Sequence, residues 1–574
     1  MGIRKISDSG RNNIDSLLSG YAWSSRNISY SFPTGGSSFI AQYSSSNEPL
    51  YGLQSLTTVQ KSAARMALNE WASVADISFN EVLEPGQSGI IRIAQSSVPV
   101  TAWGYFPSSS EGGGDIWFGT QEDYTNPRWQ SYANYAFSAF VHEIGHALGL
   151  KHPGNYSSGD DPPYADPSID ALQYSVMSYL SYPGAPQGSG MGSYSYPQTP
   201  MMDDIAAIQY MYGANYNYNS DNTTYTFDPT NITIFKTIWD GGGVDTYDCS
   251  RYTSAVVVDL APGAWSTFSN SQIASFDNGH YAPGNIANSL LYDNNPSSII
   301  ENAIGGSGND TLRGNNADNT LNGGAGNDQL WGGLGNDTYC FGRGGGIDHI
   351  LDSYDNINDV ITIANFAYQD IQAIDNVNGN LCVVFNSGDQ LIVDNWYNSP
   401  NRVNRFVLTD QVVDTTPTVR LDTTTLPGSP IFWGLSNAGM SADLSLTYNY
   451  YPGTPNSTII GLAGGTGNDS LIGNSLDNLL WGQLGDDVMA GGAGNDTYLF
   501  GRGDGTDHII ANTDNLNDAV SFYNFAYTDL QTVQNINGSL WGNFTSGDHL
   551  VVDNWFNTSE HINKFIFTDR IIDT

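Results

Sequence analysis

Hydrophobic residues recur at helical spacing in three segments of the N-terminal third of the chain. These segments cover residues 57–75, 132–150 and 200–213, and the last begins after a proline and ends at a glycine. Both features are typical of helix ends. Between the first two segments, the apolar runs IIRIAQ, TAWGYFP and GDIWFGT predict strands. The pattern therefore predicts a mixed α and β domain at the start of the chain.

From about residue 240 the pattern changes to Gly, Asn and Asp turns that separate short apolar runs, which is typical of β structure. GGSGNDTL at residue 305 returns as GGTGNDSL 159 residues later, and FGRGGGIDHI, DNWY and NRFVLTDQVVDT return at the same offset. This repeat indicates a duplicated module. We expect domains at 1–240 (with 1–20 as a candidate pro-segment), 241–415 and 459–574, joined by a connecting segment at 416–458.

Each copy of the module contains four successive units of nine residues. Such a unit divides into a tight turn, for which glycine supplies the positive φ, and a short strand. We expect the eighth residue of each unit to point into a thin core; these residues are Leu312, Leu321, Leu330, Tyr339, Leu471, Leu480, Met489 and Tyr498. We expect the sixth-position carboxylates to align on successive coils; these are Asp310, Asp328, Asp337, Asp469, Asp487 and Asp496.

Aligned carboxylates repel one another unless cations lie between them. Calcium accepts six to eight oxygens at about 2.3–2.6 Å and suits such a site better than magnesium. Turn residues such as Gly305 and Gly464 would add carbonyl ligands. Asn319 and Asn478 replace the aspartate in the second unit of each copy, so these positions would bind calcium weakly or not at all. The alternative is a series of Gly-Asn-Asp hairpins whose acids only face water.

The stretch VHEIGHALGLKH holds three of the eight histidines. His142 and His146 are four residues apart, so both rings project from one face of a helix. Gly149 allows a sharp turn after which His152 can reach the same ion. Three imidazoles leave a fourth position for water, as in a catalytic zinc site, and Glu143 could take the proton of that water. The alternative is an amphipathic helix whose histidines have no metal.

The full HExxHxxGxxH pattern resembles that of the metzincin zinc proteases. The stretch YSVMSY then resembles the methionine-containing turn of that family, with Met177 beneath the metal. Pro153 and Tyr179 resemble the serralysin branch, which implies that Tyr179 is a displaceable zinc ligand that stabilises the oxyanion. A packed aromatic ring is the alternative for Tyr179. The matrixin branch is disfavoured, because its inhibitory N-terminal cysteine has no counterpart here.

The nonapeptides resemble the RTX parallel β-roll, and the segments after them resemble the module that often follows such rolls. The resemblance implies a multidomain α+β protein: a metzincin domain, then all-β parallel rolls and β-sandwich-like modules, in duplicate. It also implies calcium-driven folding outside the cell and export by a type I secretion apparatus. WDGGGVD resembles a family calcium site at Asp240, Gly242 and Asp245, although NYNSDNTTY lacks the family's arginine.

Composition narrows the classes of partner. The 58 acidic and 19 basic residues give a formal charge of −39, which disfavours nucleic acid and anionic membranes. Three widely separated cysteines support no disulfide framework. No apolar run is long enough to span a bilayer. The first residues lack the apolar core of a secretory signal, which agrees with type I export.

Two functional hypotheses follow from these patterns. The first is a secreted, monomeric zinc endopeptidase that hydrolyses extracellular proteins, needs one catalytic Zn²⁺ and several structural Ca²⁺ ions, and pairs its substrate with an edge strand near TAWGYF. The second is an RTX calcium-binding adhesin with a vestigial protease domain. In that case exposed aromatics such as Trp396 and Trp555 would bind carbohydrate or a cell surface.

Overall fold

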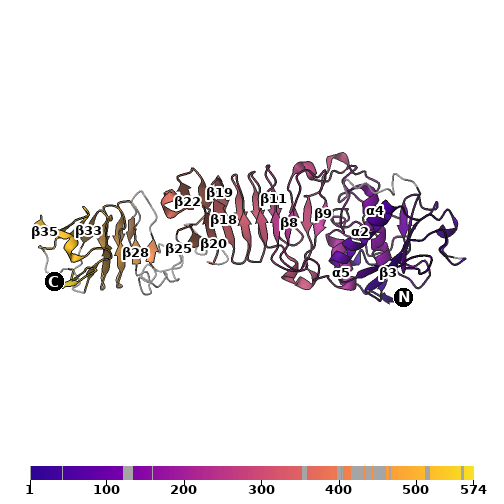
Figure 1. Cartoon of the computed structure of the whole chain (residues 1–574), viewed down its shortest axis with the longest axis horizontal. Helices are drawn as coiled ribbons and strands as arrows, with labels where there is room; N and C mark the ends of the chain where they lie inside the picture. Colours follow the sequence, from indigo (N-terminus) through magenta and orange to yellow (C-terminus); the bar gives the residue numbers. More distant parts are fainter. Residues whose placement is uncertain are drawn as a thin grey trace. The chain divides into compact units, whose positions relative to one another are not determined.

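A computed structural model describes residues 2–41, 43–120, 133–157, 159–351, 358–396, 403, 405–410, 412–414, 431–433, 441–443, 461–464, 467–510, 517–557 and 562–574. The chain divides into two compact units, residues 1–325 and 326–574. Figure 1 shows the helices gathered in the N-terminal part and β-strands in the rest. Most of the expected connecting segment 416–458, and the start of the expected helix at 132–150, lie outside the described residues. Among the described helices, none has both the length and the apolar character that a membrane span needs.

The first part of the N-terminal unit has the predicted α and β composition. Its main sheet has the order β4 (Ser78–Glu81), β3 (Asn27–Ser31), β5 (Ile91–Gln95), β7 (Ile116–Phe118) and β6 (Ala102–Gly104). β6 pairs antiparallel to β7 at the edge, whereas the other neighbours are parallel. A smaller antiparallel pair joins β1 (Ile3–Lys5) and β2 (Tyr21–Trp23). The expected edge strand at TAWGYF is therefore confirmed.

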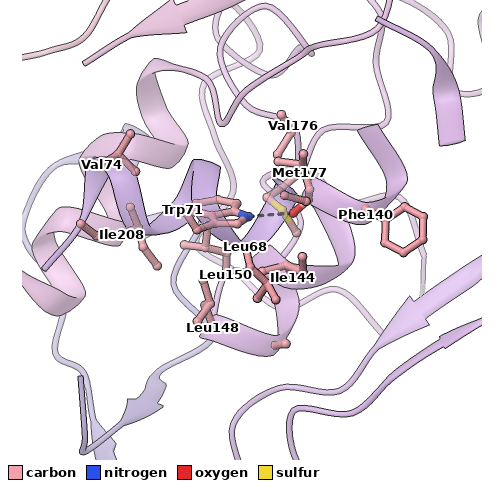
Figure 2. Packing of buried hydrophobic residues seen from close by; sticks show 14 of the residues in the cluster. Leu68, Trp71, Val74, Phe140, Ile144, Leu148, Leu150, Val176, Met177 and Ile208 are labelled. Carbon is pink, nitrogen blue, oxygen red and sulfur yellow. Dashed lines mark hydrogen bonds between the residues drawn. The ribbon is translucent and has the colours of Figure 1, made fainter. Parts of the chain in front are cut away.

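Among the described residues, four helices accompany this sheet: α1 (Asn12–Asp15), α2 (Thr58–Val74), α4 (Tyr135–Leu148) and α5 (Met202–Tyr212). α2 begins at a reciprocal capping box between Thr57 and Gln60. The indole N–H of Trp71 in α2 donates to the Val141 carbonyl of α4 over 3.0 Å. Figure 2 shows Trp71 and Met177 in one buried cluster with residues of α4. This core fixes the helix that carries two of the three histidines.

The rest of the N-terminal unit consists of short strands. β8 (Thr224–Thr226), β10 (Thr246–Asp248), β14 (Asn302–Ile304) and β16 (Thr320–Asn322) pair in parallel. β11 (Val257–Asp259) pairs with β15 (Thr311–Arg313), and β9 (Lys236–Ile238), β13 (Ile286–Asn288) and β12 (Trp265–Ser266) form a third sheet. The parallel pairing of neighbouring coils is that expected of a β-roll.

The second unit contains the rest of the first copy and all of the second. In the first copy the strands are β17 (Gln329–Trp331), β18 (Thr338–Gly342), β19 (Ile347–Ile350), β20 (Val360–Ala364), β21 (Ile371–Val377), β22 (Asn380–Phe385), β23 (Gln390–Val393), β24 (Arg405–Val407) and β25 (Val412–Asp414). In the second copy one sheet has the order β26 (Ile431–Trp433), β28 (Gly461–Ala463), β30 (Leu479–Trp481), β32 (Thr497–Phe500), β34 (Ala519–Phe522), β38 (Lys564–Ile566) and β39 (Ile571–Asp573). The other has β27 (Ser441–Asp443), β29 (Ser470–Ile472), β31 (Val488–Ala490), β33 (Thr506–Ile510), β37 (His549–Asp553), β36 (Ser539–Phe544) and β35 (Leu530–Ile536).

Successive nonapeptides alternate between the two sheets of each roll, so each strand pairs with the unit after next. Leu480 is level with Tyr498 in one sheet, and Leu471 with Met489 in the other. All eight eighth-position side chains are at most 1% exposed, so the predicted inward stack is confirmed. The strands that end each copy pair antiparallel, as in a β-sandwich.

One expectation about the modules is wrong. Trp396 is 7% exposed and its indole N–H donates to the Val403 carbonyl over 2.7 Å. Trp555 is partly buried and packs against Phe565 at a centroid distance of 5.8 Å. Trp396 is therefore buried, and Trp555 is a partly buried ring that also lines an apolar cavity. The finer domain boundaries at 240, 415 and 458 remain a proposal that rests on the sequence repeat.

Candidate metal sites

The three histidines converge at the C-terminal half of α4. The Nε2 atoms of His146 and His152 are 3.1 Å apart, and those of His152 and His142 are 3.3 Å apart. Gly149 permits this arrangement because its φ is +113°, and a Cβ atom there would lie 2.3 Å from the Tyr21 carbonyl oxygen. The chain therefore bends back after α4 and returns His152 to the other two rings.

The other ring nitrogen of each histidine faces an oxygen. Nδ1 of His142 lies 2.8 Å from the Val176 carbonyl, and Nδ1 of His146 lies 2.8 Å from the Leu150 carbonyl. Nδ1 of His152 lies 3.0 Å from a carboxylate oxygen of Asp160. Because a carbonyl or carboxylate oxygen accepts, each Nδ1 carries the proton. In the neutral rings each of the three converging Nε2 atoms is therefore unprotonated and carries a lone pair.

The rings stay neutral at pH 7. Burial lowers the pKa of His142 to about 3 and holds that of His146 well below its usual value. Burial also lowers the pKa of His152, although the carboxylate of Asp160 opposes the shift. Three nitrogens about 2.0–2.1 Å from a tetrahedral zinc ion lie roughly 3.3 Å apart. The donor set therefore fits zinc and leaves one position open.

In the described part of the chain these histidines are the one group of this kind with closely converging ligand atoms. No other set of three or more His, Cys, Asp or Glu residues there brings its ligand atoms within 4.8 Å of one another.

Glu143 lies beside this donor set. Its side chain is buried and its Oε2 has no hydrogen-bond partner. Burial raises the pKa of Glu143 to about 8, and a hydrogen bond from the backbone of Gly104 opposes part of this rise. A Cβ atom at Gly104 would lie 2.6 Å from the Glu143 carbonyl oxygen. The edge strand β6 therefore contacts α4 next to the candidate base.

The methionine turn supports the histidines from below. Met177 is fully buried, and its Sδ would lie 2.7 Å from a Cβ atom at Gly145 of α4. Asp204 of α5 holds this turn: its carboxylate accepts from Ser175 Oγ at 2.6 Å and from the backbone N–H of Val176 at 2.7 Å. Val176 in turn accepts from His142. Sequence patterns did not identify this role of Asp204, because its partners in the methionine turn are about thirty residues away.

We predict that Asp204→Ala lowers the free energy of unfolding by about 3 kcal/mol or more, because it leaves several buried donors without an acceptor. It should also weaken zinc binding, since the acceptor of His142 moves with the turn. Chemical denaturation and zinc titration measure both effects. Asp203→Ala is the matched control, because within the described residues the Asp203 carboxylate accepts from the Asn13 side chain and from no group of the methionine turn. Equal losses in the two variants would contradict this role.

Tyr179 lies at the rim of the donor set. Its ring centroid is 4.3 Å from that of His152 and 5.0 Å from that of Tyr156. The residue is 44% exposed, and partial burial with the nearby Glu143 charge raises its pKa. Pro153 is buried directly after His152. The structure thus brings Tyr179 next to the histidines, where its hydroxyl could contact a bound substrate.

The sixth-position aspartates form a buried ladder. All six are at most 2% exposed. The backbone N–H of Asp469 donates to Asp487 over 2.7 Å, and that of Asp487 donates to Asp507 over 3.2 Å. Each copy has two rows of these residues, and one further aspartate extends each row beyond the nonapeptides: Asp348, Asp359, Asp507 and Asp518. The nine-residue pattern missed them, because their spacing is longer.

The ladder leaves acidic oxygens without protein partners. Oδ2 of Asp487 and Oδ2 of Asp507 are buried and accept no hydrogen bond. Burial, together with the charges of Asp469 and Asp504, raises the pKa of Asp487 to about 7. Burial, together with the charge of Asp487, raises that of Asp507 to about 9. A Cβ atom at Gly482 would lie 2.1 Å from Asp487 Oδ2. At the predicted ligands Gly464 and Gly305 it would lie 2.2 Å from Asp469 Oδ2 and 2.5 Å from Asp310 Oδ2, which accepts from the backbone N–H of Gly306. These oxygens therefore lie against glycine turns, as a cation site requires.

Comparison with known families agrees with both sites. Residues 43–165 match the matrixin family of peptidases, and residues 304–339 and 463–498 match the RTX calcium-binding nonapeptide repeat. Residues 43–165 therefore resemble the domain of this peptidase family, within which the N-terminal cysteine of the matrixin branch has no counterpart here, and the two later ranges resemble RTX repeats. These matches, with the histidine triad, support zinc and calcium as its metals.

Its curated relatives include serralysins. The chain is 34% identical over 307 residues to "Metallopeptidase AprA" of Pseudomonas marginalis, over 50% of this chain and 60% of that protein. It is 34% identical over 299 residues to "Serralysin B" of Dickeya chrysanthemi, over 48% of this chain and 57% of that protein. It is 35% identical over 323 residues to "Metalloprotease AprA" of Pseudomonas entomophila, over 52% and 62%. The serralysin-type resemblance is confirmed, and the aligned region spans about 60% of the relatives' length.

The second unit of each set of RTX repeats contains an amide in place of the acid. Asn319 Nδ2 donates to the Glu301 carbonyl over 2.7 Å and to Asn315 Oδ1 over 3.2 Å. Asn478 Nδ2 donates to Asn474 Oδ1 over 3.3 Å. At both positions an amide N–H occupies the place where a carboxylate oxygen would bind a cation. We therefore still expect weak or no calcium binding at Asn319 and Asn478.

A further acidic site lies at the start of the roll, in the sequence between the peptidase-like range and the RTX repeats. Asp240 accepts from the backbone N–H of Gly242 at 2.9 Å, and Asp245 accepts from that of Thr223 at 2.7 Å. Asp245 Oδ2 has no partner. Burial and nearby charges raise the pKa of Asp245 to about 7. One of those charges is on Glu301, which accepts from Asp245 N–H at 2.6 Å and which sequence patterns missed.

Proposed function

We propose that this chain is a secreted zinc endopeptidase that hydrolyses peptide bonds of extracellular proteins. The observation that carries the proposal is the convergence of three Nε2 lone pairs beside the unpaired, buried oxygen of Glu143. His142, His146 and His152 would hold the zinc ion. When bound, zinc polarises a substrate carbonyl and lowers the pKa of water toward neutrality.

In the proposed mechanism Glu143 moves the proton. Its carboxylate accepts a proton from the attacking water and then passes it to the leaving amine, which requires a group whose pKa lies near the working pH. The substrate would lie extended along β6, whose free edge can add a strand. Phe106, which follows β6, packs edge-to-face on His146 at 5.4 Å. This contact places an exposed aromatic ring above the site.

We propose that Tyr179 is a displaceable zinc ligand that stabilises the oxyanion. We expect Tyr179→Phe to lower kcat by about 10²-fold with little change in KM, because the lost hydroxyl acts mainly in the transition state. Steady-state hydrolysis of a quenched peptide measures both constants. Tyr182→Phe is the control, since that ring packs on His280, at a centroid distance of 3.8 Å, and not on the histidine triad. An unchanged kcat in Tyr179→Phe would show that the ring only packs.

The adhesin hypothesis has lost its main support. The aromatic ring at Trp396 is buried, and every position of the candidate catalytic set is filled in a convergent arrangement. A casein zymogram with and without a zinc chelator separates the two hypotheses. A chelator-sensitive clear band supports the peptidase, whereas a blank gel with fully loaded zinc supports a binding protein.

The RTX repeats support an extracellular place of action. A ladder of buried carboxylates is stable only when calcium occupies it, and calcium is abundant outside the cell. We therefore propose export through a type I secretion apparatus as the unloaded chain, followed by folding on contact with calcium. We also propose calcium ligation by the six ladder aspartates, with Gly305 and Gly464, and by Asp240, Gly242 and Asp245.

A further inference from the structure

A cavity of about 270 Å³ lies within the N-terminal unit. Its walls come from α2, the first turn of α4, residues 198–199, the segment around β9, and the phenol rings of Tyr218 and Tyr225. Met66, Phe137 and Trp239 supply apolar surface. None of the histidine triad lines this cavity, so it is separate from the candidate zinc site.

Two opposite charges face the cavity without contacting each other. Glu70 comes from α2 and Lys236 from β9. In the described part of the chain neither side chain has a hydrogen bond or an ion pair within 4.0 Å, and Lys236 Nζ lies 6.0 Å from the centroid of the Phe227 ring. Burial raises the pKa of Glu70 to about 7, and the Lys236 charge opposes this rise. Burial likewise lowers the pKa of Lys236, and the Glu70 charge opposes that shift.

Such a pair is incompletely satisfied as it stands, because both side chains are partly buried. A desolvated charge needs a partner of opposite sign or several hydrogen bonds. Each group senses the charge of the other but lies too far away to satisfy it. One ligand that carries both charges would satisfy both groups at once, through charge-assisted hydrogen bonds at each end.

We propose that this cavity binds a small zwitterion with an apolar side chain, its ammonium at Glu70 and its carboxylate at Lys236. Free α-amino acids and dipeptides share this chemistry. The apolar wall at Met66, Phe137 and Trp239 would receive the side chain. The volume is near the lower end for ligand sites and therefore selects small ligands.

The first test needs no substitution. Calorimetric titration of the full chain, loaded with zinc and calcium, compares L-leucine and glycyl-L-leucine with N-acetyl-leucine and leucine amide, which each carry one charge. We expect saturable binding of at least one zwitterion, and at least about tenfold weaker binding of both single-charge analogues. Binding of leucine alone would identify free amino acids as the ligand class, and binding of the dipeptide alone would identify dipeptides. No saturable heat at about 10 mM of either zwitterion, or equal binding of the analogues, would overturn the proposal.

The second test moves the charges. Glu70→Gln and Lys236→Met each remove one charge and should weaken zwitterion binding by at least about tenfold. The double exchange Glu70→Lys with Lys236→Glu keeps both charges and should recover most of the affinity, with the ligand reversed. Lys5→Met, on the exposed strand β1, is the control and should bind as wild type. Single variants with wild-type affinity, or an exchange no better than the singles, would refute the site. If a substitution unfolds the chain, the analogue series decides.

Discussion

Glu143→Gln is expected to lower kcat/KM for peptide hydrolysis by about 10²–10⁴-fold while the zinc content stays at one ion per chain. The amide keeps the size of the side chain but cannot take a proton from water. The three histidines keep their acceptors at Val176, Leu150 and Asp160, so the metal should remain bound. Single-turnover hydrolysis and metal analysis of the same preparation measure both quantities.

Glu111→Gln is the matched control for this experiment. Glu111 is exposed, and its carboxylate accepts from the backbone N–H of Ile40. It should hydrolyse peptide at the wild-type rate. Retained turnover by Glu143→Gln, in a preparation shown to be free of other proteases, would remove Glu143 from the mechanism.

Removal of calcium is expected to unfold the RTX repeats. With calcium gone, buried acids such as Asp487 and Asp507 repel one another, and the thin core of single apolar residues cannot compensate. Circular dichroism at increasing chelator concentration should show cooperative loss of β structure, reversed by added calcium. An unchanged spectrum at full calcium removal would show that the ladder is stable by itself.

The two positions at which asparagine replaces the sixth-position aspartate, Asn319 and Asn478, allow the contribution of a single carboxylate to be measured. Asp487→Asn should raise the calcium concentration needed for folding by about tenfold or more, because affinity follows the number of charged ligands. Asn478→Asp restores a carboxylate at the sixth position of that nonapeptide and should increase the number of calcium ions bound. If Asp487→Asn has no effect on the calcium midpoint, that rung holds no calcium.

Sequence patterns predicted those features whose signal is local. The three longer helices follow from apolar periodicity and end residues, and the zinc triad from three imidazoles around one helix turn. Asp204 and Glu301 were not predicted, because their partners lie far away in sequence. The ladder aspartates at 348, 359, 507 and 518 were missed for a different reason: their coils are longer than eighteen residues. The burial of Trp396 depends on packing between two sheets, which no periodicity reveals.

The central claim is that three imidazoles hold one zinc ion beside a carboxylate. Anomalous diffraction on both sides of the zinc absorption edge, from crystals of the full chain, tests it most directly. The account predicts a single zinc peak about 2.0–2.1 Å from Nε2 of His142, His146 and His152. A loaded crystal with no peak between these rings, or with zinc held only by other residues, would contradict it.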